Sequence, residues 1–132
     1  MLDSVREIEK DLPVFLKKIK PICESYKISN KTAILELLRF LDLISFHKTP
    51  LSPSYPVDLV WHEFILFTKY YHNFCNKKYG RYIHHTPSDK SSPSLYLKTL
   101  QLYTTTFGKP SEDLWPGPSD AWNEIECGGC IN

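Results

Sequence analysis

The chain lacks any hydrophobic run long enough to cross a membrane, and it lacks a strong excess of either charge. A membrane-spanning helix needs about 18 or more consecutive apolar residues, and no stretch of the 132 residues reaches that length. The 16 Lys and Arg residues nearly balance the 15 Asp and Glu residues, for a net charge of +1. We therefore predict a small soluble protein with no membrane partner. The first residues alternate charged and apolar side chains in a helical pattern, unlike a signal peptide, so we expect a cytoplasmic location.

Cysteines, repeats and strand patterns are also scarce. Only four residues are cysteine, and in a reducing compartment these are free or metal-bound rather than bridged. No segment repeats, and no convincing alternation of apolar and polar residues predicts a strand. These absences argue against a disulfide framework, a repeat protein and a β-sheet domain.

The charges are unevenly placed along the chain. All 16 Lys and Arg residues precede position 111, whereas five of the 15 acidic residues follow it. One interpretation is a basic surface for a polyanion, masked by an acidic tail. The other is a tail that folds back onto its own domain. We favour the second because the basic residues are spread along the sequence without an arginine cluster, and we expect no nucleic-acid partner.

Apolar residues recur at helical spacing, and proline-containing loops separate the segments that carry them. The sequence predicts an all-α fold, with a small helical bundle over residues 1–110. Residues 57–79 are expected to form its central buried helix because this segment is apolar nearly all round. Gly80 is a natural stop for that helix. The other helices are expected at residues 3–11, 12–27, about 30–47 and about 92–108.

Residues 111–132 are predicted to form an irregular acidic tail. It contains Trp115, Trp122 and the sequence Cys127-Gly-Gly-Cys130. Two tryptophans bury a large apolar area, on the order of 200 Å² each, so we expect the tail to pack on the helical domain. A free tail would instead be available to dock a protein partner.

Histidines gather in the middle of the chain, where Asp58 and His62 stand four residues apart and share a helix face. A carboxylate beside an imidazole serves general-base catalysis, or it orients a histidine that binds a metal. Alternatively, Asp58 caps the helix and His62 packs beside it. His84 and His85 follow in a loop that Pro87 closes. Together with Asp58 and His62 they provide ligands that suit zinc or iron.

The distance from that loop back to His62 argues for a rival site. A chain that turns back over an unbroken helix must retrace about 25 Å to reach position 62, whereas the residues after Gly80 span only about 15 Å when extended. The path works only if the helix breaks earlier or the loop crosses from a neighbouring face. The loop reaches His72 and Cys75 more easily, so a site built on them with His84 or His85 is the geometric rival.

The rival ligand set consists of His72, Cys75, Cys127 and Cys130. His72 and Cys75 share a helix face, and three cysteines with one histidine are an ordinary zinc site. Cys75 nevertheless lies in an aromatic segment, where a buried and inert thiol is the simpler interpretation.

Residues 57–87 resemble the core of the glycine-rich domain-containing protein-like family. The resemblance rests on Asp58, on Trp61 followed by His62, on Cys75 and Gly80, and on His84-His85-Thr86-Pro87. Phe107-Gly108, Trp115-Pro116 and the terminal Cys-Gly-Gly-Cys also fit small relatives in that family. Some members have a second histidine where this chain has Phe64. The resemblance implies no assigned activity, but it groups Asp58, Trp61, His62, Cys75 and His85 as one set.

Two classes of function follow from these observations, and neither specifies a reaction or settles whether the protein is an enzyme. The first is a small helical domain that binds zinc or iron through His62 with His84 or His85. The second is an interaction module whose aromatic surface or tail, around Trp115 and Trp122, docks an unknown protein partner.

Overall fold

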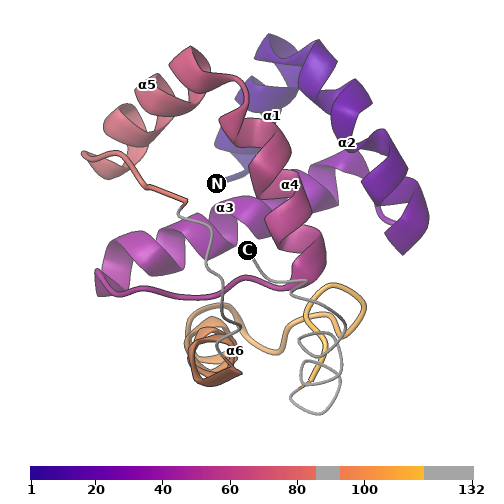
Figure 1. Ribbon diagram of the computed structural model, residues 1–132. Helices are drawn as coiled ribbons and strands as arrows, with labels where there is room; N and C mark the ends of the chain where they lie inside the picture. Colours follow the sequence, from indigo (N-terminus) through magenta and orange to yellow (C-terminus); the bar gives the residue numbers. More distant parts are fainter. Residues whose placement is uncertain (86–92, 118–132) are drawn as a thin grey trace.

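The computed structural model describes residues 1–85 and 93–117, and this part of the chain is built from helices without a strand (Figure 1). The all-α prediction is therefore confirmed. The six helices are α1 (Leu2–Asp11), α2 (Pro13–Tyr26), α3 (Asn30–His47), α4 (Tyr55–Ile65), α5 (Thr68–Tyr79) and α6 (Pro93–Phe107).

Local signals in the sequence account for most of the helix ends. The Ser29 side chain caps α3 by accepting a hydrogen bond from the backbone N–H of Thr32 at 3.0 Å, and Ser54 caps α4 in the same way through Val57 at 3.4 Å. Gly80 ends α5 with a φ of +73°, a left-handed conformation that glycine adopts without strain. The chain can therefore reverse direction directly after α5.

The predicted central helix over residues 57–79 is wrong in its length, because the chain breaks into α4 and α5 at Leu66 and Phe67. Neither residue is a helix breaker, so the cause is packing. The Phe64 ring lies 5.6 Å from the Phe74 ring, although ten residues of continuous helix would separate them by about 15 Å along the axis. The break lets α5 fold back and buries both rings against each other.

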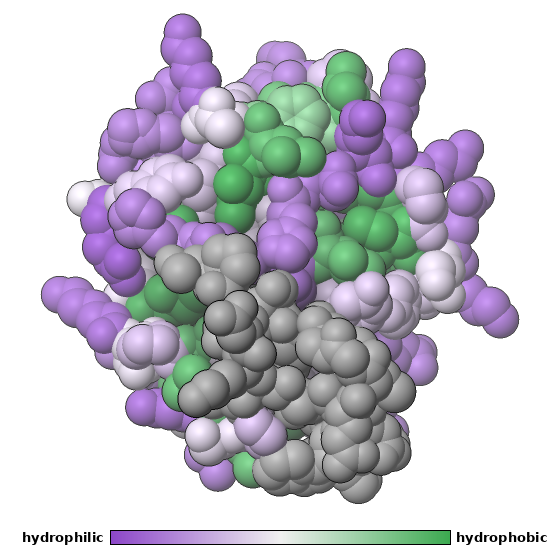
Figure 2. Space-filling view, in the orientation of Figure 1, coloured by the Kyte–Doolittle hydropathy of each residue, from purple (hydrophilic) through white to green (hydrophobic). Residues whose placement is uncertain are grey.

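Helix α4 lies at the centre of the bundle, where it packs against both α2 and α3 (Figure 1). Its residues Val57, Val60, Trp61 and Phe64 all lie in the hydrophobic core. Large exposed hydrophobic side chains are few in the described residues, and Figure 2 shows hydrophobic surface as separate patches between hydrophilic side chains. No helix in the part of the chain that the structure describes is both long and apolar enough to span a bilayer.

The segment after α6 returns to the core through Trp115, which is only 1% exposed. The indole Nε1–H of Trp115 donates to Glu36 Oε1 at 2.9 Å, and the Tyr103 hydroxyl donates to the same oxygen at 2.6 Å. Arg39 neutralises this buried carboxylate across 3.3 Å. Trp122, Cys127 and Cys130 lie outside the described residues, so the packing of the predicted tail as a whole stays a prediction.

Removing the Trp115 side chain tests how much this segment contributes to stability. We expect Trp115→Ala to lower the free energy of unfolding by about 3–5 kcal/mol, because the core loses a large ring and Glu36 loses a buried donor. Urea denaturation measures the change. Phe46→Ala is the control, since Phe46 is 68% exposed and its loss should cost less than about 1 kcal/mol. Equal effects of the two substitutions would contradict the core position of Trp115.

Candidate functional site

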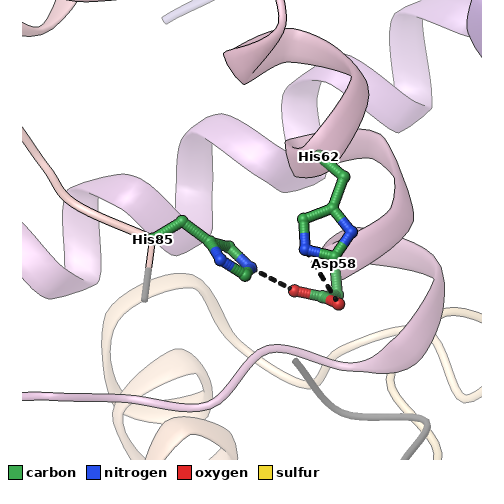
Figure 3. A group of neighbouring side chains, drawn as sticks. All are labelled: Asp58, His62 and His85. Carbon is green, nitrogen blue, oxygen red and sulfur yellow. Dashed lines mark hydrogen bonds and ion pairs between the residues drawn. The ribbon is translucent and has the colours of Figure 1, made fainter. Parts of the chain in front are cut away.

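Three side chains capable of binding a metal converge beside α4 (Figure 3). Asp58 and His62 come from α4, and His85 comes from the segment after α5, with both imidazole rings turned toward the Asp58 carboxylate. One ligand atom from each residue lies within 4.8 Å of the others. We call this group the Asp-His-His cluster. In the described residues it is the one such group of three or more histidine, cysteine or acidic side chains.

The carboxylate of Asp58 is the centre of the cluster. Its Oδ1 lies 2.7 Å from His85 Nε2, a hydrogen-bonding distance, and its Oδ2 lies 3.7 Å from His62 Nε2. The side chains of Asp58 and His85 are 2% and 7% exposed, whereas that of His62 is 42% exposed. The cluster is therefore buried on one side and open to solvent through His62.

The start of α4 positions the first two members. The Ser54 cap and Pro56 place Asp58 in the first turn of the helix, where a negative charge is favoured by the helix dipole. His62 follows one turn later on the same face, as predicted from the spacing of four residues. The local interpretation of Asp58 as a helix cap does not hold, because Ser54 is the capping residue.

A buried hydrogen-bond relay positions the third member, His85. The indole N–H of Trp61 donates to the Tyr71 hydroxyl at 3.0 Å, and that hydroxyl donates to the backbone carbonyl of Ile83 at 2.6 Å. The Trp61 ring also contacts the His85 ring at a centroid distance of 4.3 Å. The segment after α5 is thereby fixed to α4 two residues before His85.

Burial raises the pKa of the Tyr71 hydroxyl well above its ordinary value. The hydroxyl, a donor at neutral pH like any tyrosine, therefore stays protonated in alkaline solution as well. Periodicity could not identify Tyr71, because its two partners lie 10 and 12 residues away. The only signal in the sequence is the concentration of aromatic residues around the histidines.

The remaining predicted site residues lie apart from the cluster. His84 is exposed and packs against the Tyr82 ring at 4.6 Å. His72 is also exposed, and its Nε2 lies 3.1 Å from the side-chain nitrogen of Asn76. Cys75 is fully buried, and burial raises the pKa of its thiol, which works against the thiolate that a metal requires. Cys127 and Cys130 lie outside the described residues, so the rival set stays a prediction.

The fold and the cluster together define a small all-α protein with a two-histidine, one-carboxylate group beside its central helix. The family model described as UCP032817-like matches residues 12–95. The match covers more than half of the chain and includes all three members of the cluster, and the protein belongs to this family. No curated protein and no solved structure matches the chain.

The family match overturns the resemblance to the glycine-rich domain-containing protein-like family. The residues that suggested it are an aromatic helix, a terminating glycine and a histidine-proline loop. These features meet local needs of folding, such as a helix end at Gly80, and unrelated families can share them. The grouping of Asp58, Trp61, His62 and His85 now rests on their contacts instead.

Replacing Tyr71 by phenylalanine tests the relay. Tyr71→Phe leaves the Trp61 N–H and the Ile83 carbonyl buried without their partner, which we expect to cost about 1–3 kcal/mol of stability. The His85 ring resonances should also shift in an NMR spectrum of the folded variant, because the segment that carries His85 loses its anchor. Tyr82→Phe is the control, since its ring contacts Tyr71 but its hydroxyl is outside the relay. Unchanged His85 resonances in folded Tyr71→Phe would contradict the positioning role.

Proposed function

We propose that Asp58, His62 and His85 bind a divalent transition metal, either zinc or iron, and that the protein functions through this metal. The observation that carries the proposal is the convergence of two imidazole nitrogens and a carboxylate oxygen within 4.8 Å. These ligand types are common to zinc and to non-haem iron sites.

The separations of the ligand atoms support this proposal. A tetrahedral ion with bonds of about 2.1 Å holds its ligand atoms about 3.4 Å apart. The Asp58–His62 and Asp58–His85 distances of 3.7 and 2.7 Å bracket that value. These two distances end on different oxygens of the Asp58 carboxylate, so a metal bound through one oxygen would require the imidazole rings to adjust. The ion would replace the proton of the His85–Asp58 hydrogen bond.

Three protein ligands leave at least one coordination position open. Structural zinc sites usually have four protein ligands, whereas catalytic zinc keeps a position for water or substrate. The two-histidine, one-carboxylate set likewise leaves open positions on iron(II). The half-exposed His62 gives such a position access to solvent. We therefore favour a reactive or ligand-binding metal over a purely structural one.

Metal analysis of the protein purified without a polyhistidine tag tests the proposal. We expect about one zinc or iron ion per chain, and loss of that ion in Asp58→Asn and in His85→Ala. His47→Ala and His72→Ala are matched controls, because both histidines are exposed and outside the cluster; they should retain the metal. Circular dichroism verifies that each variant is folded. A folded Asp58→Asn variant with unchanged metal content would contradict the proposal.

The affinity for metal should also fall as the pH is lowered. Protons compete with a metal ion for histidine ligands in general, because only neutral imidazole binds a metal. Zinc titration against a chelating indicator should show binding at least about tenfold weaker at pH 5.5 than at pH 7.5. An affinity that does not depend on pH in this range would exclude histidine ligands.

A further inference from the structure

A cavity of about 470 Å³ lies next to the Asp-His-His cluster, and His85 belongs to both. Trp61, whose ring contacts the His85 ring, also lines the cavity. Its other walls are the C-terminal end of α3, the segment between α3 and α4, and the segment after α5. Pockets that hold small molecules have volumes of about 300–1,000 Å³. The cavity is therefore large enough for a small organic molecule.

The charged side chains that line this cavity are all basic, and the Asp58 carboxylate behind His85 is not among the lining residues. Lys48 and Arg81 carry positive charge, and the imidazole groups of His84 and His85 also line the cavity. None of the described residues that line the cavity is acidic, although the chain as a whole has almost as many acidic as basic residues. The local excess of positive charge favours a negatively charged ligand.

Arg81 is held at the edge of the cavity. Its guanidinium group donates to the carbonyl of Ile44 at 3.5 Å, so the side chain reaches from the end of α5 toward the end of α3. A guanidinium group has five N–H donors in a planar fork, and this contact uses one of them. Donors remain for a bidentate interaction with a carboxylate or a phosphate.

The other cavity walls are mainly apolar. Ile44 and Leu51 line one part, and Trp61 and Ile83 line another. An inorganic anion gains nothing from such surfaces, whereas a carbon skeleton gains about 25 cal/mol for each Å² of apolar area that it buries. The combination favours a molecule with an anionic group at one end and an apolar body at the other.

We propose that this cavity binds a small organic anion, with Lys48 and Arg81 holding its carboxylate or phosphate and the apolar walls holding its body. This inference goes beyond the proposed metal site and does not require the metal. The bound molecule would contact His85 and Trp61, and so would lie beside the Asp-His-His cluster.

Binding of matched probes tests the inference. We would titrate the protein with phenylacetate, phenylphosphonate and the neutral analogue phenylacetamide by isothermal calorimetry at low ionic strength. At least one anion should bind at least about tenfold more tightly than the amide, and high salt should weaken this preference. No anion binding at millimolar concentration, or equal affinity for the amide and both anions, would overturn the inference.

Substitutions separate a binding role from a structural one, because Lys48 and Arg81 could simply complement the C-terminal dipole of α3. Lys48→Gln and Arg81→Gln should each weaken binding of the anion at least about fivefold, whereas Lys69→Gln and Lys98→Gln, which remove exposed charges away from the cavity, should not. A lower melting temperature with unchanged anion affinity in Arg81→Gln would assign these cations a structural role and overturn the inference.

The same titration in Asp58→Asn keeps this inference distinct from the proposed metal site. This variant lacks the metal-binding carboxylate but retains every residue that lines the cavity. Anion binding that persists in it supports the cavity inference whether or not the wild-type protein holds a metal. Loss of anion binding in the folded variant would contradict the assignment of the anion to Lys48 and Arg81.

Discussion

The candidate site depends on one buried hydroxyl group, that of Tyr71. It accepts a hydrogen bond from Trp61 on α4 and donates one to Ile83 in the segment after α5. Without this hydroxyl, the Trp61 N–H and the Ile83 carbonyl would be buried without hydrogen-bond partners, which is energetically unfavourable. These hydrogen bonds therefore hold the segment after α5 against α4, in addition to packing. Both the position of His85 beside Asp58 and the cavity wall formed by Trp61, Ile83 and His85 follow from this contact.

The break between α4 and α5 makes that contact available. It allows the Phe64 ring to pack against the Tyr71 and Phe74 rings, and α5 turns back so that the segment after Gly80 can return to α4 at Ile83 and His85. The long return path expected over an unbroken helix is thus avoided, and His85 reaches Asp58. The same packing buries Cys75, which makes a thiolate ligand at this position unfavourable.

Most helices and the pairing of two of the three cluster members could be predicted from the sequence because they depend on local rules. Helical periodicity located the elements, Gly80 marked the end of α5, and the four-residue spacing placed Asp58 and His62 on one face. The break at Leu66 and Phe67 could not be predicted, because no proline or glycine marks it and only packing with distant rings explains it. For the same reason, the sequence could not show which of His84 and His85 reaches Asp58, or that Lys48 and Arg81 line the same cavity.

The interaction-module hypothesis rested on Trp115 and Trp122. Trp115 is part of the core, and Trp122 lies outside the described residues. A protein partner therefore stays a prediction.

X-ray absorption spectroscopy of the metal-loaded protein tests the central claim most directly, because it reports which atoms surround the ion. The Asp-His-His cluster predicts a first shell of nitrogen and oxygen only, at about 2.0–2.2 Å, with the outer-shell scattering of two imidazole rings. Sulfur scattering at about 2.3 Å would contradict it and would place the metal on the rival set of His72, Cys75, Cys127 and Cys130.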